Sequence, residues 1–216
     1  MIKLYFTNIN SPDSGEVFKK LLDKADLPTR EKILSYQSRS GQLARLCGKF
    51  LLNKLVPDSK KTERPIDHIK YDQWGKPFIS SDFDFNISHS GNIVICGGVT
   101  DAKIGVDIEK EEARDISGMQ EYFTTKEWST ISGTGIVTPF YKMWVRKEAC
   151  LKAAGKGFLR PLHEIDVCDD EVVLDNSKWF LHDLLIRDGY AACVATNKQN
   201  ENISVEEVDI NTLVNE

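Results

Sequence analysis

The stretch 103–109, KIGVDIE, alternates aliphatic residues with small or polar ones and opens the second half of the chain. Strict alternation is typical of a β-strand, whose successive side chains point to opposite faces. The aliphatic residues therefore share one face, and Asp107 and Glu109 share the other, about 7 Å apart along the strand. Two carboxylates so placed can share a hard cation such as Mg²⁺, which prefers oxygen ligands. A solvated polar face at a strand end would show the same pattern.

Similar elements lie on both sides of this strand. Before it, the pattern predicts a strand at 3–7, helices at 15–25, 29–37 and 40–56, and strands at 69–73, 76–80, 83–88 and 92–99. From residue 100 onward it predicts the strand at 103–109, helices at 115–123, 125–131 and 138–157, and strands at 164–168, 171–175, 191–196 and 203–209. The recurring order predicts an α+β fold with two similar halves, residues 1–100 and 101–216, although no residue-level repetition accompanies it.

Composition narrows the class of protein. The net charge of −5 gives no reason to expect nucleic-acid binding, and no segment approaches the roughly 20 apolar residues that span a bilayer. The five cysteines are odd in number and mostly lie in apolar surroundings, which predicts reduced core residues. We therefore expect a cytoplasmic protein that binds neither nucleic acid nor membrane.

The predicted helix 138–157 carries a second group of charged side chains. Thr138 and Pro139 are typical of a helix start. Glu148 and Lys152, four residues apart, lie on one face. Such a pair is usually a surface ion pair, but beside Asp107 and Glu109 the Glu148 carboxylate would complete a metal site, and Lys152 could neutralise a phosphate oxygen.

Two short polar motifs precede the strand at 103–109. The motif at 85–91, FNISHSG, places Ser88 and His89 where a strand runs into a turn, an arrangement that suits phosphate oxygens. A histidine in a turn is, however, more often a hydrogen-bonded structural residue. The motif at 75–77, GKP, presents Lys76 in a turn. We interpret all four tryptophans, including Trp74, as packing residues.

Together these motifs resemble the 4'-phosphopantetheinyl transferase superfamily, in its larger class of pseudo-dimeric enzymes typified by the activator of surfactin synthetase. The matching blocks are 75–77, 85–91, 104–110, FTTKEW at 123–128, and 144–152 followed by GKG at 155–157. The resemblance implies a pseudo-dimer with the active site between its halves. It also implies an enzyme that moves the phosphopantetheine arm of coenzyme A onto a serine of an apo acyl, polyketide or peptidyl carrier protein and releases adenosine 3',5'-bisphosphate.

The resemblance also implies roles for individual residues. Asp107, Glu109 and Glu148 match the carboxylates that bind Mg²⁺, which Mn²⁺ can replace. Lys152 matches a lysine that contacts phosphate and assists transfer. Residues that would hold the nucleotide and phosphates of coenzyme A are Lys76, Ser88, His89 and Lys152. The segment 124–128 resembles the region that contacts the carrier protein.

One position departs from the family pattern. Arg45 lies one step later than the arginine that the family commonly has, so either Arg45 or Arg39 is expected to reach the 3'-phosphate. Glu148, Lys152 and His89 are the expected catalytic residues, with Glu148 or metal-bound water as the base. Because both halves could line one cleft, we expect a monomer. A non-catalytic relative and a Mg²⁺-dependent phosphohydrolase are the alternatives.

Overall fold

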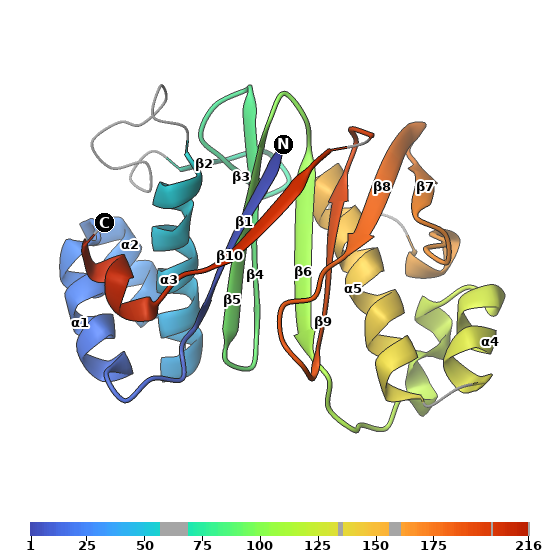
Figure 1. Ribbon diagram of the computed structural model, residues 1–216, viewed down its shortest axis with the longest axis horizontal. Helices are drawn as coiled ribbons and strands as arrows, with labels where there is room; N and C mark the ends of the chain where they lie inside the picture. The colour runs from blue at the N-terminus through green and yellow to red at the C-terminus, as the bar shows by residue number, and fades with distance from the viewer. Residues whose placement is uncertain (57–68, 134–135, 156–160, 200, 216) are drawn as a thin grey trace.

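Two four-stranded sheets stand side by side in the middle of the molecule, and helices cover the outer side of each (Figure 1). The computed structural model describes residues 1–56, 69–133, 136–155, 161–199 and 201–215. The first sheet has the strand order β10-β1-β5-β4, and the second has the order β6-β9-β8-β7. The predicted α+β class is confirmed at this level.

The elements occur in the following order along the chain. Up to residue 100 they are β1 (Ile2–Asn8), α1 (Ser14–Lys24), α2 (Leu27–Leu34), α3 (Arg39–Leu55), β2 (Lys70–Tyr71), β3 (Pro77–Phe78), β4 (Phe83–Ser90) and β5 (Ile93–Thr100). Beyond it they are β6 (Ile104–Lys110), the 3-10 helix η3 (Ser117–Tyr122), α4 (Thr125–Gly133), α5 (Val137–Ala154), η5 (Leu162–Glu164), β7 (Glu171–Leu174), β8 (Ser177–Asp183), β9 (Tyr190–Thr196), β10 (Ile203–Glu207) and η6 (Ile210–Asn215).

The aliphatic face of β6 is buried between the two sheets, as the alternating pattern predicts. Ile104, Val106 and Ile108 are fully buried in a cluster with residues of β1, β5 and β9. The opposite face of β6 is left for α5, which packs on β6 and β9. The alternation in the sequence thus separates a sheet–sheet core from a helix–sheet contact that carries Asp107 and Glu109.

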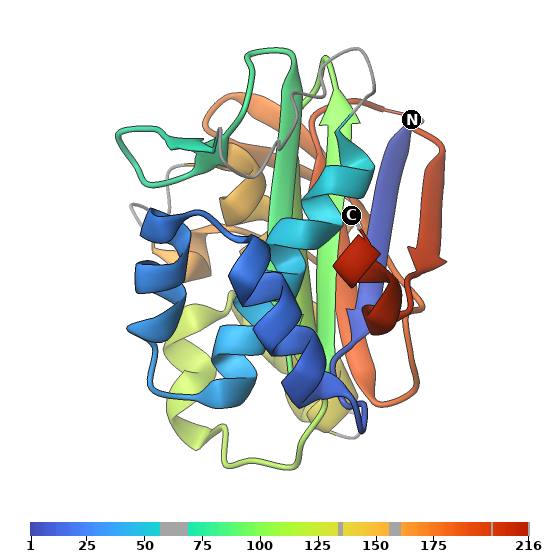
Figure 2. The ribbon, with the colours of Figure 1, turned by 90° about the vertical axis from the view of Figure 1, so that its left-hand side faces the viewer.

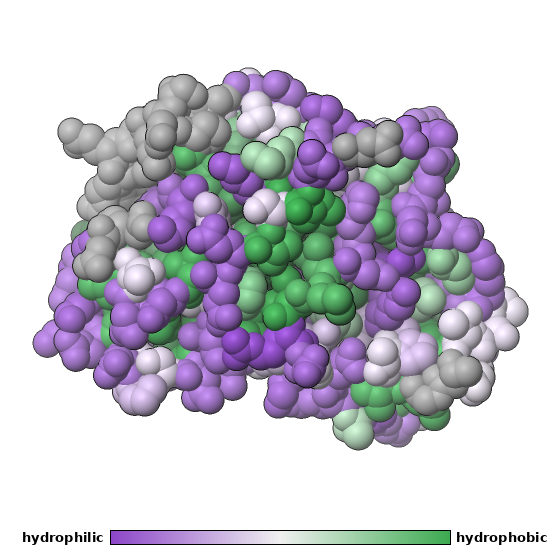
Figure 3. Space-filling model, in the orientation of Figure 1, coloured by the Kyte–Doolittle hydropathy of each residue, from purple (hydrophilic) through white to green (hydrophobic). Residues whose placement is uncertain are grey.

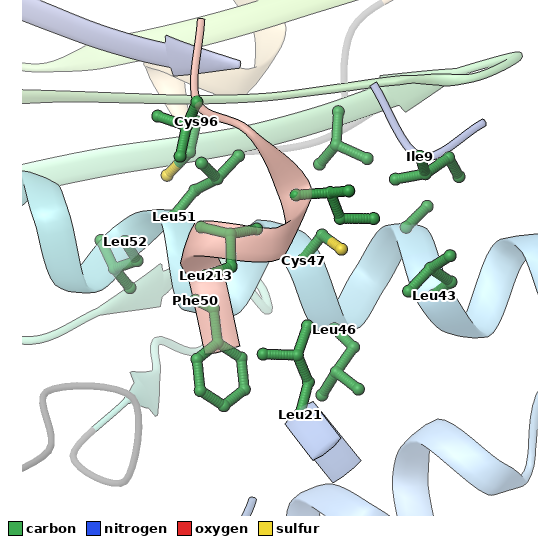
Figure 4. Packing of buried hydrophobic residues seen from close by; sticks show 14 of the residues in the cluster. Ile9, Leu21, Leu43, Leu46, Cys47, Phe50, Leu51, Leu52, Cys96 and Leu213 are labelled. Atoms are coloured by element: carbon green, nitrogen blue, oxygen red, sulfur yellow. The ribbon is translucent and has the colours of Figure 1, made fainter. Parts of the chain in front are cut away.

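The helices α1, α2 and α3 lie over the first sheet, with the end of the chain beside them (Figure 2). In this core, Leu46 and Phe50 of α3 gather with Leu21 of α1 and Leu213 of η6 (Figure 4). All four side chains are at most 2% exposed. The amphipathic pattern of α3 therefore brings distant parts of the chain into one apolar core.

The last strand returns to the first sheet. β10 pairs in parallel with β1, in the register Ile2 with Ile203. Residues near the C-terminus thus complete the sheet that begins at the N-terminus, although they follow residue 100. The division of the chain at that residue stays a prediction.

Two strand predictions are wrong. Residues 164–168 form no strand, because their backbone groups bond to buried charged side chains: Arg146 donates to the carbonyl of Val167, and Glu127 accepts from its amide. The strand β8 (Ser177–Asp183) is absent from the predictions, and it pairs with both β7 and β9. The second sheet reaches four strands only with β8.

Hydrophobic side chains also gather on the surface near the middle of the front face, where β10 crosses in front of β1 (Figure 3). Val205 of β10 is 38% exposed. Among the described residues, no helix is both long and apolar enough to cross a membrane.

Candidate active site

The site is built where α5 lies directly on β6. A Cβ atom added to Gly105 would stand 2.1 Å from the carbonyl oxygen of Ala149 and 2.3 Å from the amide nitrogen of Ala153. Only a residue without a side chain permits this approach. It brings Glu148 and Lys152 of α5 beside the polar face of β6.

Asp107 lies at the centre of the site and is 3% exposed. Its Oδ1 accepts hydrogen bonds from Lys152 Nζ at 2.6 Å and from Ser88 Oγ at 2.8 Å. Its Oδ2 is buried without a hydrogen-bond partner. Burial raises the pKa of Asp107, while Lys152 and Ser88 oppose that rise. The structure thus joins Ser88 of β4, Asp107 of β6 and Lys152 of α5.

Glu109 and Glu148 complete a group of three carboxylates. Burial raises the pKa of Glu109, which accepts a hydrogen bond from Ser90 Oγ at 2.6 Å. Burial also raises the pKa of Glu148 to about 7, the charges of Asp107 and Glu109 add to the rise, and Lys152 opposes it. Like charges held together disfavour the ionised forms. A bound cation would relieve this repulsion.

Glu148 and Lys152 border a cleft of about 260 Å³ between the turn that joins β2 to β3, the strand β4 and the C-terminal part of α5. It is lined by Trp74, Gly75, Lys76, Pro77, Asn86, Glu148, Leu151, Lys152 and Gly155. Trp74 is 51% exposed here, so its interpretation as a packing residue is wrong. Of the GKG block at 155–157, Gly155 adopts the left-handed conformation that ends α5 (φ 73°), and residues 156 and 157 lie outside the described ranges.

His89 lies within the electrostatic reach of two cations. Burial lowers the pKa of His89, and the charges of Arg45 and Lys152 lower it further. Arg45 stacks its guanidinium over the Tyr36 ring, 4.1 Å from the centroid. Arg39 instead stacks over Phe18 and borders a separate pocket beside α1. Of the two arginines singled out in the sequence, Arg45 is therefore the one whose charge acts on the histidine.

Lys76 lines the cleft, but its ammonium group already has partners. Nζ lies 2.7 Å from Asp84 Oδ2, and it donates to the carbonyl oxygens of Ile104 at 3.3 Å and Ala153 at 3.4 Å. Lys76 therefore ties the turn before β3 to β4, β6 and the end of α5.

A buried ion pair that no sequence motif indicates lies behind the site. Lys147 and Glu127 are both fully buried, and Lys147 Nζ lies 2.8 Å from Glu127 Oε2. Lys147 also donates to the carbonyl oxygens of Leu162 and Ile165, while Glu127 accepts from the amides of Thr124 and Val167. Lys147 stands next to Glu148, and Glu127 lies in the segment expected to contact carrier protein. No local pattern marks the two as partners, because they are twenty residues apart.

The carboxylate oxygens of the site suit a hard cation, although the side chains of the site hydrogen-bond to one another. In the part of the chain that the structure describes, no three His, Cys, Asp or Glu side chains are positioned to hold a metal ion together. Lys152 and Ser90 occupy carboxylate oxygens of Asp107 and Glu109. The buried Oδ2 of Asp107 nevertheless lacks any partner, which an oxygen-seeking cation would supply.

Comparison with known proteins finds relatives in one enzyme family. The family model of the 4'-phosphopantetheinyl transferase superfamily matches residues 103–195. A 4'-phosphopantetheinyl transferase of Aneurinibacillus migulanus is 24% identical over 225 residues, which cover 100% of this chain and 94% of that protein. One from Bacillus subtilis is 28% identical, with 77% and 76% covered. A phosphopantetheinyl transferase of a Thraustochytrium species is 31% identical, with 59% of this chain and 51% of that protein covered.

Proposed function

Because the chain belongs to the 4'-phosphopantetheinyl transferase superfamily and is an enzyme of that type, we propose that it transfers 4'-phosphopantetheine from coenzyme A to a serine of an apo carrier protein. The second product is adenosine 3',5'-bisphosphate. The observation that carries the proposal is the contact of Lys152 with Asp107 beside Glu148, where α5 lies on β6 and where Glu148 and Lys152 line a cleft.

The cleft suits a long anionic substrate. Lys152 lines the cleft and supplies positive charge there, and the charges of Lys152 and Arg45 both act on the nearby His89. Trp74, half exposed at the cleft, offers a flat face for a base. We assign the nucleotide and phosphates of coenzyme A to these residues together with Ser88 and Lys76.

We assign the metal, Mg²⁺ or Mn²⁺, to Asp107, Glu109 and Glu148. When bound, this cation would draw negative charge from the pyrophosphate of coenzyme A. Lys152 would stabilise charge on the nucleotide side, because its ammonium group already reaches into the site to Asp107. Asp107 would hold Lys152 in place through their contact.

Glu148 is our candidate for the base. Burial and the neighbouring carboxylates raise the pKa of Glu148 to about 7 in the site without a cation, which makes this carboxylate the most basic candidate near Lys152. In the proposed step, the serine oxygen forms a bond to the phosphorus that carries pantetheine. The bond from that phosphorus to the bridging oxygen breaks, adenosine 3',5'-bisphosphate leaves, and the serine proton passes to Glu148.

We also propose that the chain acts as a monomeric pseudo-dimer. Each sheet carries one long helix, α3 or α5, on its outer side, and Ser88 from the first sheet meets Asp107 from the second. One chain therefore supplies both sides of the cleft. All five cysteines are free, in keeping with a reducing cytoplasm.

The test is to incubate the purified protein with coenzyme A, Mg²⁺ and apo acyl or peptidyl carrier proteins and to follow each carrier by intact mass. We expect the carrier protein to gain the mass of one phosphopantetheine unit, and we expect no gain when EDTA removes the metal ion. No gain on any carrier would contradict the proposal. Release of phosphate from coenzyme A without an acceptor would favour a phosphohydrolase instead.

Two variants test the assigned residues in the same assay. Asp107→Asn and Lys152→Met should each lower the rate at least 100-fold, on the order of the loss when a group that stabilises developing charge is removed. The matched controls Glu16→Gln and Lys20→Met lie in an exposed ion pair on α1 and should leave the rate unchanged. A normal rate for either site variant would remove that residue from the mechanism.

A further inference from the structure

The strands β4 and β6 are neighbours, but they belong to different sheets. Because β6 pairs with β9 on one side, the amides of alternate β6 residues point toward β4. Unpaired backbone amides inside a protein are costly, so these groups need acceptors.

Side chains of β4 provide the acceptors. Asp84 Oδ2 accepts from the amide of Ile104 at 2.8 Å, and Asn86 Oδ1 accepts from the amide of Val106 at 3.0 Å. Ser90 Oγ accepts from the amide of Lys110 at 3.1 Å. In each pair the two residues are twenty positions apart. We call these three hydrogen bonds the edge ladder.

The regular spacing of these hydrogen bonds is interrupted beside Asp107. Ser88 stands opposite Ile108 by the same offset, but its hydroxyl donates to Asp107. The amide of Ile108 instead acts on the Asp107 carboxyl group and opposes the rise of its pKa. One step further, Ser90 both accepts from the Lys110 amide and donates to Glu109. The edge ladder thus brackets the two β6 carboxylates.

The far end of the edge ladder is joined to α5. Asp84 Oδ2 also accepts from Lys76, and Lys76 donates to the carbonyl oxygens of Ile104 and Ala153. The same few atoms therefore link β4, β6 and the helix that carries Glu148 and Lys152. Asp84 is 5% exposed and Asn86 is 8% exposed, so water competes little for these bonds.

We infer that Asp84 and Asn86 are positioning residues. They fix the position of β6 along β4 and thereby place Asp107 and Glu109 opposite Glu148. The inference rests on the proposed function for its catalytic part. The alternative is that the edge ladder contributes only to stability. The two differ because a positioning role changes turnover in a protein that is still folded, with coenzyme A still bound.

The experiment compares three variants in the full chain. Asn86→Leu keeps the approximate volume and removes the acceptor, while Asn86→Asp keeps an acceptor in the same place. Thr7→Val is the matched control, because Thr7 is fully buried on β1 and its hydroxyl has no partner. For each, hydrogen exchange of the Val106 amide is measured by NMR, and kcat and KM for coenzyme A are measured with a carrier protein.

For Asn86→Leu we expect exchange at Val106 to accelerate at least tenfold and kcat to fall at least tenfold, with KM for coenzyme A within threefold of the wild type. Asn86→Asp should recover most of both, and Thr7→Val should change neither. Faster exchange with a normal kcat would overturn the positioning role. Unchanged exchange, or a change confined to KM, would overturn it as well.

If Asn86→Leu fails to fold, Asn86→Ser replaces it, with the same expectations at smaller amplitude. The exchange measurement requires no substrate. If the wild type modifies no carrier protein, the proposed function fails, while exchange at Val106 still decides whether the edge ladder exists.

Discussion

The two long helices pack on their sheets by opposite means. In α3 the close contact is made by a helix glycine: a Cβ on Gly48 would stand 2.6 Å from Cγ2 of Ile87 on β4. In the second sheet the glycine is in the strand, where a Cβ on Gly105 would meet the backbone of α5. A side chain can rotate away, but a helix backbone cannot, so the second contact is the stricter one.

The helices also differ in what they bury. The buried residues of α3 are all apolar, apart from the glycine. Helix α5 buries Arg146 and Lys147 among its apolar residues. Hydrophobic burial alone holds the first contact, whereas the second also depends on paired charges in fixed directions. The proposed catalytic residues Glu148 and Lys152 therefore lie on the helix whose packing has the stricter geometric requirements.

The largest expected effect comes from breaking the buried pair behind α5. Lys147→Met leaves Glu127 buried without its partner, which should lower the free energy of unfolding by about 3–5 kcal/mol. Urea denaturation measures it. Lys20→Met, in the exposed α1 pair, should leave the urea midpoint unchanged. If Glu127→Gln combined with Lys147→Met recovers none of the loss, then an unpaired charge is not its cause.

Next is Gly105→Ala. The added methyl group forces α5 away from β6, and we expect a loss of about 3 kcal/mol in unfolding free energy and at least a tenfold loss of transfer rate. Urea denaturation and the carrier assay measure the two effects. Near-normal stability and rate would show that α5 can move outward without harm, and the contrast between the helices would then disappear.

A smaller effect is expected where α5 meets the end of β8, because Asp183 accepts a hydrogen bond from Arg146 at 2.7 Å. Burial raises the pKa of Asp183, but the hydrogen bonds and charges of Arg146 and Lys142 outweigh it and hold the pKa below 3.8. A lowered carboxyl pKa stabilises the folded state above the unfolded pKa, and this contribution is lost as the pH falls through the folded pKa.

Asp183→Asn should therefore reduce stability at pH 7 by about 1 kcal/mol, since the carboxyl is partly exposed. The difference from the wild type should shrink as the pH is lowered below 3.8. Denaturation curves across this pH range measure the difference. A gap of constant size from pH 7 to pH 2 would mean that the Asp183 charge contributes nothing.

The smallest effect is expected at Gly48→Ala on α3. The methyl group requires a shift of the Ile87 side chain, but alanine favours a helix over glycine by roughly 1 kcal/mol, so the two effects nearly cancel. Thermal unfolding should change little. A loss as large as that of Gly105→Ala would contradict the distinction between a side-chain contact and a backbone contact.

The local sequence pattern was sufficient to predict the helices and strands that have clear periodicity or capping residues. The alternation at 103–109 predicts β6, and Thr138 and Pro139 predict the start of α5 to within one residue, whereas α5 ends at Ala154, three residues before the predicted end. It failed at 164–168, where the backbone bonds to charged side chains of distant helices, and at β8, although the turn residues Asp175 and Asn176 before it, both at positive φ, are typical of a hairpin.

The sequence by itself determined the class of fold, the strand with its two carboxylates and the charged face of α5, because periodicity reports which side of an element is buried. Only the tertiary structure decided that Lys152 meets Asp107 and Ser88, that Lys76 is bound to Asp84, and that β4 serves β6 through the edge ladder. These contacts join residues eight to sixty-four positions apart. Their geometry follows from how the sheets and α5 pack, which no local pattern encodes.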